Sequence, residues 1–85
     1  MALVLMGTEA CHLCEEAQAL LIQLQSRLLA DVLLEDIAES ETQVQRYGQR
    51  IPVLLHEESG AELDWPFDSL QLKQWLAQHQ CLQSL

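Results

Sequence analysis

The sequence predicts a single α/β domain in which a four-stranded mixed sheet is flanked by three helices. The first sign is a short apolar run over residues 2–6, followed by apolar residues at helical spacing over 13–29. The second is a pair of capping boxes, at 40–43 and 68–71, which predict two later helix starts. The third is a hairpin pattern over 53–65 between them. The predicted order is strand, helix, strand, short helix, two hairpin strands and a final helix.

The first half of the chain predicts a β-α-β unit. Residues 2–6 form a buried strand that Gly7 and Thr8 end. The following helix has one apolar stripe, made by Leu13, Ala17, Leu20, Leu21, Leu24 and Leu28. Residues 32–37 predict a second strand, which we expect to be parallel to the first and central in the sheet. The right-handed rule for parallel crossovers places the connecting helix on one face.

Turn and capping residues divide the second half of the chain. A helix should open at Ser40 and end at Tyr47, with Gly48 as a left-handed cap. Residues 53–56 and 61–65 predict two antiparallel strands joined by a turn.

The last helix is predicted from its start signal and its apolar face. Pro66 ends the preceding strand, and the box at 68–71 opens the helix. One face of this helix carries Leu72, Trp75, Leu76 and His79.

Composition bounds the class of partner. Thirteen Asp and Glu residues face four Lys and Arg residues, so the 85-residue chain carries a net charge of -9. Such a surface repels nucleic acid and anionic lipid, and we expect neither as a partner. The run at 2–6 is too short and lacks the basic flank of a signal peptide or a membrane span. Three cysteines without framework spacing indicate a reducing compartment. We expect a cytoplasmic monomer of one domain, residues 1–85.

The motif Cys11-His12-Leu13-Cys14 lies between the first strand and the first helix. Unpaired N–H groups and partial positive charge at a helix N-terminus favour a thiolate. Two cysteines three residues apart share one face of the first turn, so one sulfur can attack the other. The position therefore predicts thiol–disulfide chemistry, with Cys11 at the exposed tip as nucleophile and Cys14 beneath the first turn as resolving thiol.

The chain resembles the thioredoxin-like fold in its glutaredoxin-like form, and is most similar to a family of short bacterial glutaredoxin-like proteins. The resemblance is carried by the cysteine motif and by the segments 47–54 and 63–68, and it covers nearly the whole chain. It implies that Cys11 is the nucleophile, that Cys14 resolves, and that Pro52 is a cis proline facing them. It also implies that the Ile51 backbone is free to pair with a peptide or glutathione substrate.

Other positions depart from the glutathione-binding pattern that the resemblance implies. Arg50 and Ile51 stand where many glutaredoxins have Thr-Val, and Trp65-Pro66 replaces a Gly-Gly turn of which only Asp68 remains. Glutathione is thus a possible reductant whose usual contacts are largely missing, and no cofactor is required. Arg50 could pair with the thiolate or with a substrate carboxylate, although a solvated loop charge is the plainer interpretation.

The remaining candidates have plainer interpretations. His12 could stabilise the thiolate or carry a proton, or it could be an ordinary exposed loop residue. His56 and His79 are expected to have no function, Trp65 and Trp75 to pack in the core, and Cys81 to be a free thiol.

Three functions stay open on the sequence. The leading one is a thiol–disulfide oxidoreductase that acts on protein or low-molecular-weight disulfides. The second is a non-enzymatic interaction module that uses the fold as a scaffold. The third is metal or iron–sulfur binding, which lacks the second ligand pair that closed zinc sites need, so we expect no metal.

Overall fold

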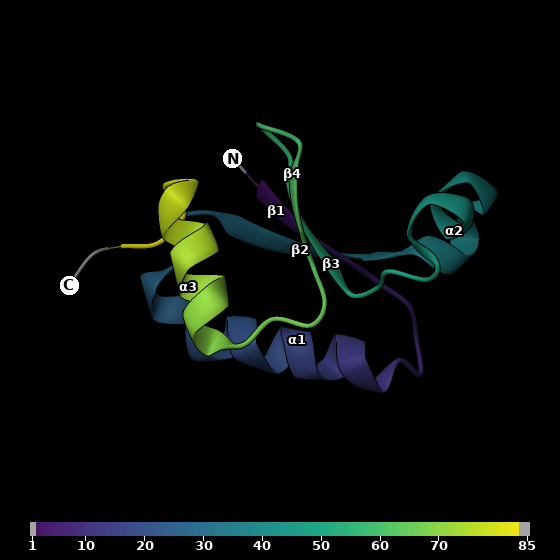
Figure 1. The fold of residues 1–85 in the computed structure, drawn as a ribbon, viewed down its shortest axis with the longest axis horizontal. Helices are drawn as coiled ribbons and strands as arrows, with labels where there is room; N and C mark the ends of the chain where they lie inside the picture. The colour runs from purple at the N-terminus through teal and green to yellow at the C-terminus, as the bar shows by residue number, and fades with distance from the viewer. Residues whose placement is uncertain (1, 84–85) are drawn as a thin grey trace.

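The four strands form one mixed sheet in the order β2-β1-β3-β4 (Figure 1). In the computed structural model, which describes residues 2–83, they span Ala2–Gly7 (β1), Asp31–Asp36 (β2), Val53–His56 (β3) and Ala61–Asp64 (β4). β1 pairs in parallel with β2 and antiparallel with β3, and β3 pairs antiparallel with β4. The predicted α/β fold with a mixed sheet is confirmed.

The helices are α1 (His12–Gln23), α2 (Glu41–Tyr47) and α3 (Ser69–Gln78), with single 3₁₀ turns at Gln25–Arg27 (η1) and Ile37–Glu39 (η2). In Figure 1, α2 and α3 lie toward opposite ends of the sheet and α1 runs along it. The predicted capping box of α3 is present in full, because Asp68 and the residue three positions on exchange both hydrogen bonds. At α2 only the Ser40 half forms, since the Gln43 side chain donates to Glu35 instead.

Two hydrophobic clusters lie on opposite faces of the sheet. The larger cluster packs α1 and α3 against odd-numbered β1 residues such as Leu3 and Leu5. The smaller cluster packs Tyr47 of α2 against Val4, Met6 and Val53. Alternation along β1 therefore assigns each residue of that strand to one face, and Gly7 belongs to the α1 face.

The prediction that the second strand is central is wrong. β1 already pairs with β3 on one side, so β2 takes the other side and becomes an edge strand. As a result Leu33 and Leu34 stay 53% and 60% exposed. An apolar run cannot distinguish an edge strand from a central one, because it does not report how many neighbours the strand has.

Two local predictions also differ from the structure. The first helix ends at Gln23 instead of continuing to residue 29; a 3₁₀ turn follows it, and the Leu29 N–H donates to the Cys81 carbonyl at 2.8 Å. Leu13, predicted as part of the buried stripe, is 43% exposed. Gly48 is right-handed (φ -53°), and a Cβ there would collide with the Val44 carbonyl oxygen.

The C-terminal segment is joined to the turn after α1. Besides the Leu29–Cys81 bond, the Gln83 N–H donates to the Arg27 carbonyl at 2.7 Å, and Leu28 forms a bridge with Leu82. This short antiparallel contact lies at the end of α1 opposite to its cysteines. Over residues 2–83, no helix combines the length and the apolar character that crossing a membrane requires.

Candidate functional site

Cys11 and Cys14 form a disulfide at the N-terminus of α1, with their Cα atoms 5.2 Å apart. Cys11 is the N-cap residue, and its Sγ accepts the Cys14 N–H at 3.1 Å. Cys11 is partly exposed, whereas Cys14 is buried at 8% exposure. The outer sulfur, that of Cys11, thus accepts a hydrogen bond from a helix N–H and is accessible to a partner. The inner sulfur, that of Cys14, is buried beneath it.

Gly7, the last residue of β1, places Cys14 against the sheet. A Cβ on Gly7 would lie 3.0 Å from the Cys14 Sγ, which is closer than most real Cβ contacts. The missing side chain therefore lets the inner sulfur rest directly on the strand end. The loop between them turns through Ala10, which has a positive φ of 57°.

Pro52 lies at the same end of the sheet as the cysteines. Met6 pairs with Val53, so continuing this antiparallel register puts Pro52 beside Gly7. The Ile51–Pro52 peptide bond is cis, as the resemblance implied, and the Trp65–Pro66 bond is also cis. Pro52 is fully buried, and its carbonyl accepts the Trp65 N–H at 3.1 Å.

The Ile51 N–H, part of the backbone expected to be free for a substrate, has a partner inside the protein. It donates to the Tyr47 carbonyl at 3.0 Å, which closes the chain after α2. That donor is therefore already used inside the protein.

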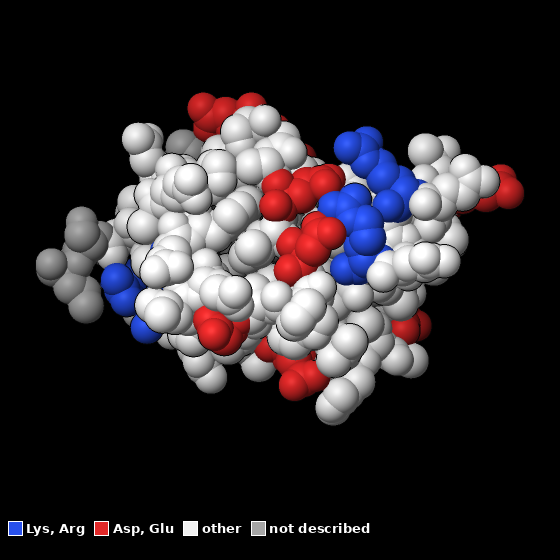
Figure 2. Space-filling model, in the orientation of Figure 1, with Lys and Arg blue, Asp and Glu red and all other residues white. Residues whose placement is uncertain are grey.

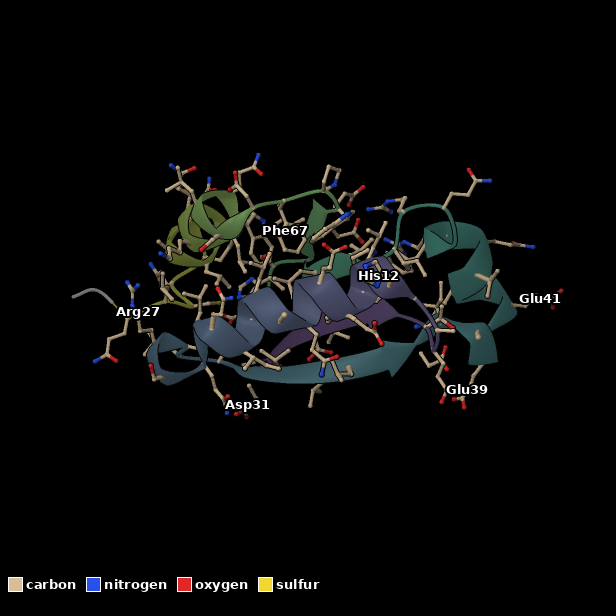
Figure 3. All side chains as sticks on the ribbon, turned by 90° about the horizontal axis from the view of Figure 1, so that it is seen from below. His12, Arg27, Asp31, Glu39, Glu41 and Phe67 are labelled. Atoms are coloured by element: carbon tan, nitrogen blue, oxygen red, sulfur yellow. A yellow bond between two sulfur atoms is a disulfide. The ribbon has the colours of Figure 1, made fainter. Side chains whose placement is uncertain are left out.

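His12 points into solvent at the start of α1. Its side chain is 85% exposed, and its two ring nitrogens lie 3.8 and 3.9 Å from the carboxylates of Glu15 and Glu16. Figure 3 shows His12 toward the end of the molecule that carries Glu39 and Glu41, away from Arg27. The surface around the outer sulfur is thus largely acidic.

Arg50 is engaged by two carboxylates of β4. Its Nε and one terminal nitrogen donate to Asp64 at 2.9 and 2.7 Å, and that terminal nitrogen also donates to Glu62 at 2.6 Å. The guanidinium also lies over the Tyr47 ring, whose hydroxyl donates to Glu62 at 2.9 Å. Arg46 approaches Glu62 at 3.9 Å. We call these five residues the β4 charge cluster. Figure 2 shows basic atoms that abut acidic ones on the surface, as the arginine–carboxylate pairs of such a cluster do.

The hydrogen bonds from Arg50 dominate the electrostatics of this cluster. They hold the pKa of Glu62 and the pKa of Asp64 below their ordinary values. Burial, and then the bond to Glu62, raises the pKa of Tyr47. Arg50 therefore links β4 to the loop that contains Pro52. The hydrogen-bond partners of its guanidinium are residues of the protein itself.

Sequence reasoning missed Tyr47, Glu62 and Asp64 as part of this region. Glu62 and Asp64 are two residues apart on a predicted strand, so they had to share one face. Asp64 pairs with Val53, which brings it near the residues that precede β3. The alternation was visible in the sequence, but choosing Arg50 as the partner required the register.

The other candidates lie apart from the cysteines or have structural contacts. Asp68 caps α3, with its Oδ1 accepting the Gln71 N–H at 2.7 Å. Cys81 is a buried free thiol, and burial raises its pKa. His56 is buried beside Trp75 and His79. Across residues 2–83 no group of three or more His, Cys, Asp or Glu side chains is placed to hold a metal ion.

Comparisons with known proteins agree with this architecture. The family model described as Glutaredoxin-like domain (DUF836) matches residues 2–77. No curated protein matches the chain. Among solved structures, the X-ray structure of the structural-genomics target protein XcR50 from X. campestris is 36% identical with a TM-score of 0.80, covering 89% of this chain and 96% of that one.

Two solution structures are similar as well. That of XcR50 is 37% identical with a TM-score of 0.75, over 92% of this chain and 95% of that chain. That of protein Ne2328 from Nitrosomonas europaea is 33% identical with a TM-score of 0.74, over 87% and 88%. The fold is therefore the glutaredoxin-like form of the thioredoxin-like fold.

Proposed function

Because the chain belongs to the glutaredoxin-like domain family, we propose that it is a thiol–disulfide oxidoreductase acting through Cys11 and Cys14. The observation that supports this most is the position of the Cys11 Sγ, which caps α1 and accepts the Cys14 N–H. In the reduced protein the same N–H and the helix terminus favour the thiolate over the thiol at Cys11. The difference in exposure between the two sulfurs supports the order of attack.

The reaction needs only the two cysteines and a substrate disulfide. The Cys11 thiolate attacks one substrate sulfur, which breaks the substrate S–S bond, forms a mixed disulfide and releases the other substrate sulfur as a thiolate. The Cys14 thiolate then attacks the Cys11 Sγ and releases the second substrate thiolate. The substrate gains two electrons and the protein is left with the Cys11–Cys14 disulfide. An external thiol reductant returns it to the dithiol.

For the substrate we propose protein or low-molecular-weight disulfides, met in the cytoplasm by a monomer. Glutathione is the reductant that the family resemblance implies. Its binding has little support from the Arg50 side chain and the Ile51 N–H, because both have partners inside the protein.

The test is reduction of a neutral model disulfide, hydroxyethyl disulfide, by the wild type and three cysteine variants, with dithiothreitol or glutathione as donor. We expect Cys11→Ser to abolish activity and Cys14→Ser to trap the mixed disulfide on Cys11, which mass spectrometry detects. Cys81→Ser is the matched control and should retain wild-type rates, because Cys81 is buried at the other end of the fold. We expect dithiothreitol to support turnover better than glutathione.

A wild type that is no faster than Cys11→Ser would contradict the proposal. The scaffold function would then be favoured, in which the fold serves binding alone.

A further inference from the structure

A groove lies beside the inner cysteine, on the side of β1 away from Pro52. Its volume is about 260 Å³, and its walls come from the β1–α1 loop, the start of α1 and the end of β2. Leu5 and Leu34 form an apolar floor, and Cys14 and Gly7 lie at its wall. The groove is therefore open to a side chain that approaches together with a sulfur bound at Cys11.

Two acidic residues, Glu9 and Asp36, line this groove. Glu35 also borders it, but its side chain points to the α2 face of the sheet, where it accepts a bond from Gln43. Asp36 accepts one bond from the Ala38 N–H, so it keeps a second oxygen. Within residues 2–83, no Lys, Arg or His pairs with Glu9 or Asp36.

The three arginines of the chain are engaged elsewhere. Arg46 and Arg50 pair with carboxylates of β4, and Arg27 donates to the Gln83 carbonyl at the far end of α1. The carboxylates beside this apolar groove thus face solvent, and no Lys or Arg side chain in the described part of the chain pairs with them.

We propose that this groove binds a Lys or Arg side chain of the substrate polypeptide, next to the cysteine whose disulfide is reduced. A basic residue has an aliphatic stem that fits over Leu34 and a charged head that reaches the rim. Charge complementarity selects this occupant over an acidic or neutral one. This inference rests on the proposed function, because it names the substrate class of the same site: disulfides in basic surroundings, in preference to anionic ones.

Rates on matched peptide disulfides test the selection. Three short peptides, each a mixed disulfide with 2-mercaptoethanol, carry Lys, norleucine or Glu beside the cysteine. At low salt we expect the reduced protein to react about tenfold faster with the Lys peptide than with the Glu peptide, and this ratio should fall below about twofold at 0.5 M NaCl.

Two double variants separate the groove from the net charge. Glu9→Gln/Asp36→Asn removes the groove carboxylates and keeps the acceptor that the Ala38 N–H uses. Glu57→Gln/Glu58→Gln removes the same charge from exposed positions at the other end of the sheet. We expect the first double variant to lose the Lys preference and the second to keep it. Equal losses would overturn the proposal, because the preference would then follow net charge alone.

A binding measurement separates this proposal from the redox proposal. The Lys peptide with Ser in place of Cys is titrated into the oxidised protein, and amide shifts are followed by NMR. We expect shifts at Gly7, Leu34 and Asp36 that the Glu9→Gln/Asp36→Asn variant lacks. Shifts without any disulfide reduction would contradict only the proposed function. Reduction without these shifts and without the Lys preference would overturn only the groove.

Discussion

Both edge strands of the sheet carry carboxylates, but the partners of these carboxylates differ between β4 and β2. On β4, Glu62 and Asp64 accept hydrogen bonds from Arg50, and Glu62 accepts another from the Tyr47 hydroxyl. On β2, the partners of Glu35 and Asp36 within residues 2–83 are a side-chain amide and a backbone N–H. One edge has its charge compensated inside the molecule, and the other presents it outward.

The same contrast appears in one row of leucines that crosses the sheet. Leu34, Leu5, Leu54 and Leu63 are neighbours in register on the α1 face. Leu63 of β4 packs against the main core, whereas Leu34 of β2 is 60% exposed. The β4 edge therefore contributes to stability, and the β2 edge is a surface with capacity to bind.

Truncation of the two outer leucines should show this difference most strongly. We expect Leu63→Ala to lower the free energy of unfolding by about 2 kcal/mol, because it leaves a cavity against the core. Leu34→Ala should cost about 0.5 kcal/mol or less, since its side chain is mostly in water. Urea denaturation measures both, and equal costs would contradict the assignment of the two edges.

Removing the arginine of the β4 charge cluster should have a smaller effect. Arg50→Ala leaves two carboxylates side by side, and we expect a loss of about 1 kcal/mol after allowing for solvent screening of this partly exposed pair. Arg46→Ala is the control: its guanidinium is more exposed and lies 3.9 Å from Glu62, so the loss should be below about 0.5 kcal/mol. Similar denaturation midpoints for the two variants would refute a special role for Arg50.

The pH dependence of stability should show the smallest effect of the three. It reports on the ion pairs of Arg50 with Glu62 and Asp64. Because Arg50 lowers the pKa of Glu62 and the pKa of Asp64, the folded carboxylates contribute stability above their unfolded pKa values of about 4. This contribution is lost as the pH falls through the lower folded pKa values. We expect the wild type to exceed Arg50→Ala in unfolding free energy at pH 6, and the gap to narrow at pH 3. A gap that widens toward acid would reverse the sign and contradict the pairing.

Local signals in the sequence predicted much of the fold. The Asp68–Gln71 capping box, the Ser40 cap and the hairpin all depend on residues within a few positions of one another, and all are present. The cysteine pair at the start of a helix was likewise a local pattern. The family resemblance correctly implied the cis bond before Pro52.

What could not be predicted depends on strand order and register. The edge position of β2 follows from the pairing of β1 with β3, which the composition of residues 32–37 does not encode. The partners of Arg50 follow from the pairing of Val53 with Asp64. A left-handed cap at Gly48 was also a wrong prediction. The backbone there is right-handed, and glycine is needed because a Cβ would collide with the Val44 carbonyl oxygen.

The antiparallel contact of residues 81–83 with the turn after α1 also has a practical consequence for handling the protein. α1 has twelve residues and is about 18 Å long, and Cys11 caps its opposite end. Attaching the protein to a bead or electrode through the segment of residues 81–83 would therefore leave the Cys11–Cys14 disulfide facing the solution. The length of α1 would keep the Cys11 sulfur away from the support, and the segment itself is held to the protein by hydrogen bonds.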